Sequence, residues 1–495
     1  MACPGSTELV AGIDMATAEV RVKVADATGH VVVRGRESLG PPERLGPGWS
    51  QADASRWWPA AGAALRQATA ELDEGSRIVA VAVAATSGTV LVVDADGQAL
   101  GPALMYDDQR AGAEAETARR AGADRWDALG FRPGATSGLA KWAWLLARPG
   151  VAERAAHTWH ASDMVVGQLI GAPPPTDWSH ALKSGFDSAQ GEWAWEVMDA
   201  LGIPPRLLPE VHPPTALAGT VTPEAAAATG LAAGCHVVLG MTDGCSAQMA
   251  AGADRPGRFV TVVGTTMVVK GASADLAHDP SGAVYSHRHP AGWWLPGGAS
   301  NTGGAAVDVD PADLGDLDRL AGQRGPAGTV AYPLRATGER FPFVAPEAEG
   351  FWLGEPGDEI ERHRAVLEGV GFLERLAYAH LDDLGAVAIG GVRSAGGGGR
   401  SREWAAIRAT ILHRPVLVTH GADSALGACI LAAAEALHPD LTTAVEHMVT
   451  EGEQVAPVES QIADLDRSFA RFVSALADRG WIDDRLSRAA GAQLH

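Results

Sequence analysis

The sequence lacks the features that mark several specialised classes of protein. Its cysteines are few, at Cys3, Cys235, Cys245 and Cys429, and none stands in a CxxC spacing. Neither a zinc site nor a dense disulfide framework is therefore indicated. The longest apolar run near the start, residues 78–85, is far shorter than the ~20 residues of a membrane-spanning helix. The N-terminus has no basic region followed by an apolar core, so we expect a cytoplasmic protein with reduced thiols.

Positive charge is also scarce. The chain has 39 Lys and Arg against 60 Asp and Glu, a formal net charge of -21. Nonspecific binding to nucleic acid or to anionic membranes needs a cationic surface, so we predict neither as a partner. A small anionic ligand remains possible through local donors or a metal ion.

Familiar catalytic signatures are missing as well. The four lysines, Lys23, Lys141, Lys183 and Lys270, do not occur in G-x-x-x-x-G-K-[ST], which excludes a P-loop enzyme. The chain has no G-x-S-x-G, no H-E-x-x-H and no G-x-G-x-x-G that opens a helix after a strand. With 495 residues, of which 46% are hydrophobic and 20% charged, it should form two large globular domains or three smaller ones.

The most informative stretch runs from residue 237 to residue 270. An apolar strand is followed by Met241-Thr242-Asp243-Gly244 and a helix of small residues. Asp243 is a candidate for chemistry, because a buried carboxylate is costly without a partner or ligand; the alternative is that it only caps the helix. The turn Gly264-Thr265-Thr266 offers backbone N–H and hydroxyl donors that can hold phosphate.

The two halves of the chain begin alike. Residues 9–13 predict a strand that ends at Asp14, and the alternation at 20–24 predicts a second strand of a three-stranded meander. Residues 258–263 and 267–270 repeat this layout around the phosphate turn. Such a duplication predicts two domains of one fold that face each other.

Further along, the pattern predicts a long amphipathic helix over 359–383 and a strand over 386–389. The glycine-rich stretch 394–401 then opens a helix, where backbone and helix dipole favour a polar or anionic ligand. The helix of small residues at 423–434 must pack closely against another element.

Together these features resemble the FGGY carbohydrate kinases of the actin-like ATPase superfamily. The resemblance extends to about residue 440 and rests on Gly12-Ile13-Asp14 with Thr17 and Arg21, Asp243, Gly264-Thr265-Thr266, Ala395-Gly396-Gly397-Gly398 with Trp404, and Leu426-Gly427-Ala428. It implies two α/β domains of actin-like (ribonuclease H-like) fold, each a mixed β-sheet flanked by helices, with an interdomain cleft. Residues 1–250 would bind sugar, residues 251–440 would bind ATP, and residues 441–495 would form a helical extension.

The resemblance also implies an activity. Thr86-Ser87-Gly88-Thr89-Val90, Tyr285-Ser286-His287 and 297–301 are most similar to the D-ribulokinase branch. The chain would therefore phosphorylate a ketopentose with ATP, D-ribulose to D-ribulose 5-phosphate, with D-xylulose or another sugar or polyol as the alternative.

The implied roles fall on residues of both halves. Asp243 would be the catalytic base, and Asp14 with Asp243 would place Mg²⁺, through water. Sugar contacts would come from Ser87, Asp108, Arg110 and Asp243. The cofactor-binding residues would be Thr17, Arg21, Gly264, Thr265, Thr266, Gly303, Gly304, Gly396, Gly397, Gly398 and Ser401.

The first phosphate turn departs from the family's Asp-x-Gly-Thr-[Ser/Thr]. Here it reads Asp14-Met15-Ala16-Thr17-Ala18. Ala16 adds a Cβ where backbone must approach phosphate, and Ala18 removes a hydroxyl donor. Either the turn tolerates alanine, or the chain is a nucleotide-binding regulatory protein with weakened catalysis. The sequence leaves the oligomeric state open.

Overall fold

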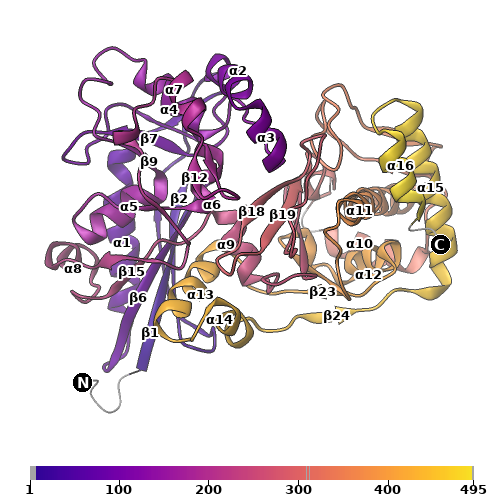
Figure 1. The fold of residues 1–495 in the computed structure, drawn as a ribbon. Coiled ribbons are helices and arrows are strands. Elements are labelled where there is room, and N and C mark those ends of the chain that lie inside the picture. The colour runs from indigo at the N-terminus through magenta and orange to yellow at the C-terminus, as the bar shows by residue number, and fades with distance from the viewer. Residues whose placement is uncertain (1–6, 308, 311–312, 493–495) are drawn as a thin grey trace. The chain divides into compact units, whose positions relative to one another are not determined.

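The chain forms two compact units in the computed structural model, which describes residues 7–307, 309–310 and 313–492. The first unit comprises Met1–Ala250, Pro290–Gly292 and Asp423–Val449, and the second comprises Ala251–His289, Trp293–Ala422 and Thr450–His495. Each has its own mixed β-sheet with flanking helices (Figure 1). Each also has its own apolar core. The predicted two-domain α/β fold is confirmed.

The central sheet of the first unit has the strand order β14-β15-β6-β1-β2-β3. Strands β1, β6 and β15 run parallel to their neighbours in this group, whereas β1, β2 and β3 form an antiparallel meander. Alternate side chains of a strand point to opposite faces, and in β2 it is Val20, Val22 and Val24 that are buried. The strands are β1 (Thr7–Met15), β2 (Glu19–Ala25), β3 (Val31–Ser38), β6 (Ser76–Ala85), β14 (Leu217–Thr220) and β15 (His236–Val238).

Helices cover this sheet. Helix α1 packs against β2 and β3, and α13 packs against β1 and β6. The small residues of α13 permit close packing, since a Cβ on Gly12 would lie only 2.0 Å from the carbonyl oxygen of Ala425. The helices of the unit are α1 (Trp57–Ala70), α2 (Gly112–Ala121), α3 (Ala123–Leu129), α4 (Gly138–Leu146), α5 (Ala161–Ile170), α6 (Trp178–Ala181), α7 (Trp195–Ala200), α8 (Pro223–Thr229), α9 (Asp243–Ala250), α13 (Ser424–Ala436) and α14 (Leu441–Met448).

Smaller sheets complete the first unit. The larger has the order β4-β5-β8-β7-β9, and two others pair β10 with β13 and β11 with β12. Their bounds are β4 (Glu43–Gly46), β5 (Trp49–Ala52), β7 (Val90–Val93), β8 (Ala103–Leu104), β9 (His157–His160), β10 (Thr176–Asp177), β11 (Phe186–Asp187), β12 (Glu192–Trp193) and β13 (Val211–His212).

The second unit is built on a sheet of order β18-β19-β17-β16-β22-β23-β24, and β20 pairs with β21 apart from it. The strands are β16 (Phe259–Val263), β17 (Met267–Gly271), β18 (Tyr285–Arg288), β19 (Trp294–Ala299), β20 (Val330–Tyr332), β21 (Phe351–Leu353), β22 (Val392–Ala395), β23 (Val416–Val418) and β24 (Glu453–Val455). The helices are α10 (Leu314–Arg324), α11 (Glu359–Asp383), α12 (Arg402–Leu412), α15 (Ile462–Asp478) and α16 (Asp484–Ala492).

Most predicted elements are confirmed, with one displaced strand. The hairpins β1/β2 and β16/β17 occur where the duplicated pattern placed them, and α11 has the predicted bounds. The strand predicted over 386–389 is wrong: these residues form none, and Ile389 is 73% exposed. The strand follows instead at β22, where Val392 is fully buried. Burial against the sheet, which local hydrophobicity does not reveal, decides between the two segments.

Two features concern the whole chain. No helix of the described residues combines the length and hydropathy needed to cross a membrane. Cys235, Cys245 and Cys429 are buried and form no disulfide, and Cys3 lies outside the described residues.

Candidate functional site

Three parallel strands of the first unit end at the same edge of their sheet. Strand β1 ends next to Asp14, β6 leads into the Ser87 turn, and β15 leads toward Asp243. A parallel bridge between Ala85 and Thr242 continues the pairing to the residue before Asp243. Because carboxyl ends of parallel strands meet at one edge, the structure brings these predicted residues together.

Asp14 is almost fully buried, with 1% of its surface exposed. Arg21, directly opposite on β2, donates from Nε to Asp14 Oδ2 at 3.0 Å. The other oxygen, Oδ1, has no hydrogen-bond partner among the described residues. Burial raises the pKa of Asp14 to about 6, because lost hydration outweighs Arg21, and the negative charge of Asp243 adds to the rise. The two predicted carboxylates are thus electrostatic neighbours.

Asp243 is the first residue of α9. Its Oδ1 accepts a hydrogen bond from the backbone N–H of Gly244 at 2.6 Å. That bond to the next residue differs from the usual N-cap bond to the second or third residue of a helix. Asp243 is half-buried at the strand edge. A general base must be reachable by the substrate, and this partial exposure allows it.

The predicted sugar contacts lie beside this edge. The Oγ of Ser87, in the turn after β6, is a buried polar atom without a hydrogen-bond partner in the described structure. Asp108 is fully buried, and its oxygens accept from the backbone N–H of Ser50 at 2.6 Å and from Arg110 Nε at 2.9 and 3.0 Å. Arg110 lies over the Trp49 ring, 4.3 Å from its centroid. Asp108 therefore holds Arg110 in place, and Ser87 keeps a donor available.

Lys141 is a residue of this region that sequence reasoning missed. It is fully buried on α4 and donates to the carbonyl oxygens of Gly88 at 2.5 Å and Met105 at 2.9 Å. It thus joins the Ser87 turn to the segment that leads to Asp108. Burial lowers the pKa of Lys141 to about 7, and nearby Asp108 limits the fall. The available signal was its position as a rare lysine within an otherwise apolar helix.

In the second unit the predicted phosphate turn joins β16 to β17. The backbone N–H of Gly304 donates to the carbonyl oxygen of Gly264 at 2.7 Å, and Ala305 donates to Thr265 at 3.1 Å. A Cβ on Gly303 would lie 2.3 Å from the carbonyl carbon of Thr266. Gly303 and Gly304 therefore pack against the turn where no side chain fits, and Thr265 remains exposed above it.

The glycine-rich loop lies at the same edge, because β22 runs parallel to β16 and ends just before it. Gly396 has φ +87° and its Cβ would clash with the backbone of Val263, so only glycine suits this position. A Cβ on Gly398 would press on Trp404 and Val263, whereas one on Gly397 would meet no atom within 4 Å. The space beside Gly397 is therefore open.

Ser401 begins α12. Its Oγ accepts from the N–H of Trp404 at 3.2 Å and donates to Asp318 Oδ2 at 2.6 Å. Asp318 in turn contacts His363 at 2.7 Å. The predicted cofactor-binding serine is therefore a helix cap already engaged with the protein.

A divalent cation fits the residues at Asp14. Among the described residues no group of three or more His, Cys, Asp or Glu could hold a metal. Mg²⁺ is usually held by one or two carboxylates, water and substrate phosphates, and does not need such a cage. The unpartnered, buried Oδ1 of Asp14 suits that role.

Comparison with known proteins matches both halves of the chain to one family. The N-terminal domain of the FGGY family of carbohydrate kinases matches residues 9–250, and its C-terminal domain matches residues 259–436. The chain belongs to the FGGY family of carbohydrate kinases. It is therefore an ATP-dependent phosphotransferase with an alcohol group as acceptor.

Relatives and solved structures agree with this assignment. A xylulose kinase of Streptomyces coelicolor is 30% identical over 445 residues, covering 86% of this chain and 87% of the relative. A gluconokinase of Bacillus subtilis is 24% identical and covers 92% of each chain. The crystal structure of xylulose kinase from Rhodospirillum rubrum has a TM-score of 0.85 at 29% identity and covers 95% of this chain and 98% of that one. The similarity does not single out a ribulokinase branch.

The predicted first phosphate turn has a backbone conformation that suits alanine at position 16. Apart from glycines, His413 is the residue with a positive φ among the described residues. Ala16 therefore has a backbone conformation that any L-residue can adopt. Gly264, the equivalent position of the second turn, likewise needs no positive φ. Glycine at position 16 is thus unnecessary for the turn itself, and only the volume of the Ala16 Cβ remains to affect a bound phosphate.

Proposed function

We propose that this kinase phosphorylates a ketopentose, with ATP as donor and Mg²⁺ as the accompanying cation. The observation that carries the proposal is the neighbouring pair of Asp14 and Asp243 at the edge where three parallel strands end. Phosphoryl transfer to an alcohol needs a carboxylate that accepts the hydroxyl proton and a second group near the transferring phosphate. Asp243 takes the first role and Asp14 the second.

The relatives favour D-xylulose among the ketopentoses. Two proteins named xylulose kinase, from Streptomyces rubiginosus and Streptomyces coelicolor, are 29% and 30% identical to this chain. D-Ribulose is the second candidate, because three stretches resemble the D-ribulokinase branch: Thr86-Ser87-Gly88-Thr89-Val90, Tyr285-Ser286-His287 and 297–301. The two sugars differ in the configuration of one hydroxyl, so a few contacts such as Ser87 would separate them.

The remaining residues support the transfer. The sugar would lie against the unpartnered Oγ of Ser87 and against Arg110, which Asp108 holds in place. In the second unit, the Gly264 turn and the open space beside Gly397 would take the nucleotide. Bound Mg²⁺ would neutralise phosphate charge beside Asp14, whose raised pKa means that the carboxylate is available above pH about 6.

An ADP-release assay with a panel of D-xylulose, D-ribulose, glycerol, erythritol and gluconate tests the substrate. We expect the highest kcat/KM with D-xylulose, and a preference for gluconate or a polyol would overturn the ketopentose proposal. Asp243→Asn tests the base, with kcat expected to fall by ~10² to 10⁴ at nearly unchanged sugar KM. A helix-capping Asp243 would tolerate Asn without loss of rate.

The second candidate function is that of a nucleotide-binding regulatory protein with weakened catalysis, because Ala16 and Ala18 depart from the family pattern. It predicts binding of ATP without turnover on any sugar of the panel. Calorimetric titration with ATP, run beside the panel, separates the two functions.

A further inference from the structure

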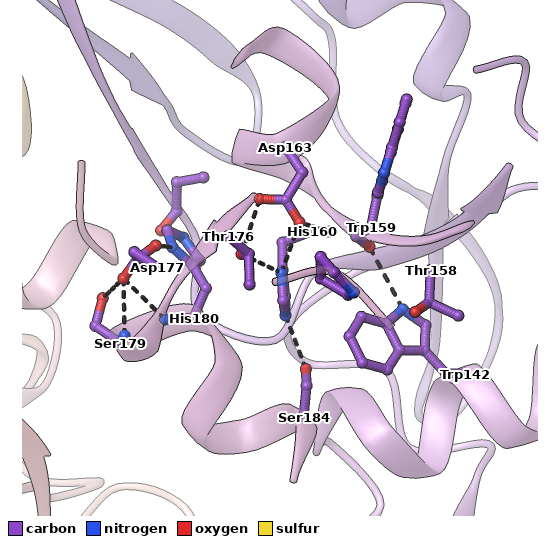
Figure 2. Close-up of polar contacts among 12 residues, drawn as sticks. Trp142, Thr158, Trp159, His160, Asp163, Thr176, Asp177, Ser179, His180 and Ser184 are labelled. Carbon is purple, nitrogen blue, oxygen red and sulfur yellow. Dashed lines mark hydrogen bonds and ion pairs between the residues drawn. The ribbon is translucent and has the colours of Figure 1, made fainter. Parts of the chain in front are cut away.

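A cluster of buried polar side chains lies in the first unit, apart from the residues assigned above (Figure 2). None of its members is more than 2% exposed. They come from β9, α5, β10, α6 and the short 3-10 helix Leu182–Ser184 that follows. The cluster consists of His160, Asp163, Thr176, Asp177, Ser179, His180 and Ser184.

An ion pair lies at one end of this cluster. The Nδ1 of His180 contacts a carboxylate oxygen of Asp177, and its Nε2 lies 3.3 Å from the carbonyl oxygen of Ala85. Both partners accept hydrogen bonds, so these contacts suit a ring that carries a proton on each nitrogen. Burial lowers the pKa of His180, but the charges of Asp177 and Asp163 outweigh it and the pKa is raised.

The cluster reaches the candidate base through one hydroxyl. Ser179 Oγ donates to Asp177 and accepts from the backbone N–H of Thr242 at 2.9 Å. Thr242 immediately precedes Asp243, and its carbonyl oxygen accepts from Cys245 at 3.0 Å and Ser246 at 2.8 Å in α9. Ser179 therefore fixes the point at which α9 begins.

The same residues also hold the sugar turn. His180 contacts Ala85, two residues before Ser87, and Ala85 is bridged to Thr242. A buried ion pair adds little net stability, since desolvation offsets the attraction. Stability alone therefore gives a weak reason for placing a charged pair here, at the junction of the two strand ends.

We propose that Asp177, Ser179 and His180 are positioning residues that hold Asp243 and the Ser87 turn in the geometry for phosphoryl transfer. This inference rests on the proposed function, in which Asp243 is the base. It assigns no contact with substrate to the three residues. Their effect on the reaction passes through the start of α9 and the end of β6.

The chain offers a matched control for Ser179. Ser184 is equally buried in the same cluster, and its hydroxyl contacts His160 Nε2 at 2.9 Å but neither Thr242 nor Ala85. Ser179→Ala and Ser184→Ala each remove one buried hydroxyl, so we expect similar losses in Tm. Only Ser179→Ala should lower kcat, by roughly ten- to hundredfold, with the KM for ATP unchanged. Equal kcat values in the two variants would overturn the proposal.

A double-mutant cycle distinguishes this inference from the proposed function. If Ser179 acts through Asp243, Ser179→Ala should not reduce the residual kcat of Asp243→Asn further. An additive loss would show that Ser179 acts by another route. A near-normal kcat in Asp243→Asn alone would instead refute the base, whatever Ser179→Ala does.

His180→Asn is a second variant in case Ser179→Ala does not fold. Asparagine can keep the donor to Asp177 and loses the contact with Ala85. We expect a folded protein with a raised KM for the sugar and a lowered kcat. Wild-type values of both constants would contradict the positioning role of His180.

Discussion

At the residue scale, Asp14 links the pH dependence of stability to that of activity. Its folded pKa of about 6 lies above the ordinary 3.8, so its ionisation costs stability in the folded state. Its stabilising contribution is present below pH about 4 and is lost as the pH rises through 6. Activity should follow the opposite course and fall below pH 6, as the carboxylate takes up a proton.

Asp14→Asn cannot ionise and should separate the two effects. We expect it to abolish most activity and to raise Tm relative to the wild type at pH 8, and by less at pH 4.5. Arg21, which loses its ion pair with Asp14, is 43% exposed and stays hydrated. Melting curves at the two pH values check this, and a pH-independent difference in Tm would contradict the raised pKa.

A second prediction at this scale concerns Lys141. It donates to the carbonyl oxygens of Gly88 and Met105, and the latter also accepts from the backbone N–H of Asp108. Lys141→Met therefore removes the ammonium donor from both oxygens and loosens the Ser87 turn. We expect the KM for the sugar to rise by about tenfold, equivalent to ~1.4 kcal/mol of lost binding. The KM for ATP serves as the internal control, and an equal rise in both would indicate general damage.

At the element scale, the turn between β1 and β2 tests the alanine at position 16. Ala16→Gly removes the Cβ and should lower the KM for ATP or raise kcat. Because position 16 has an ordinary backbone conformation, glycine there should also cost about 0.4–1 kcal/mol of stability through the unfolded chain. Steady-state kinetics and a melting curve measure both effects. Unchanged or worse kinetics would mean that the turn holds phosphate in another way.

The glycine-rich loop gives another prediction about an element. Gly397→Val adds a side chain to open space at ordinary φ, so the fold should persist while the KM for ATP rises. Gly398→Val is the informative contrast, because a side chain there presses on Trp404 and should lower Tm. A folded Gly397→Val with normal KM for ATP would remove this loop from the nucleotide site.

At the scale of the whole molecule, the sugar and the nucleotide should protect different peptides. We expect hydrogen exchange of residues 85–110 to slow with D-xylulose, and that of residues 264–266 and 396–398 to slow with ADP. Protection of the same peptides by either ligand alone would contradict this assignment. The interdomain cleft expected from the sequence stays a prediction.

The sequence by itself determined the fold class and the family, and it named the candidate site residues. Alternation at Val20, Val22 and Val24 and the turns after Asp14 and at Gly264 are local patterns, so they could be read without a structure. Local hydrophobicity failed at residues 386–389, since burial depends on partners distant in sequence. The family and the candidate site residues could be named from the sequence, but the contacts around those residues could not.

Only the tertiary structure decided how these residues are held. The partners of Lys141, the engagement of Ser401 with Asp318, and the contact from Ser179 to Thr242 join segments far apart in the chain. The same is true of α13, which follows strand β23 of the second unit in sequence yet packs on β1 of the first. Such contacts depend on the folded path of the backbone, and a periodic pattern records only which side of an element is buried.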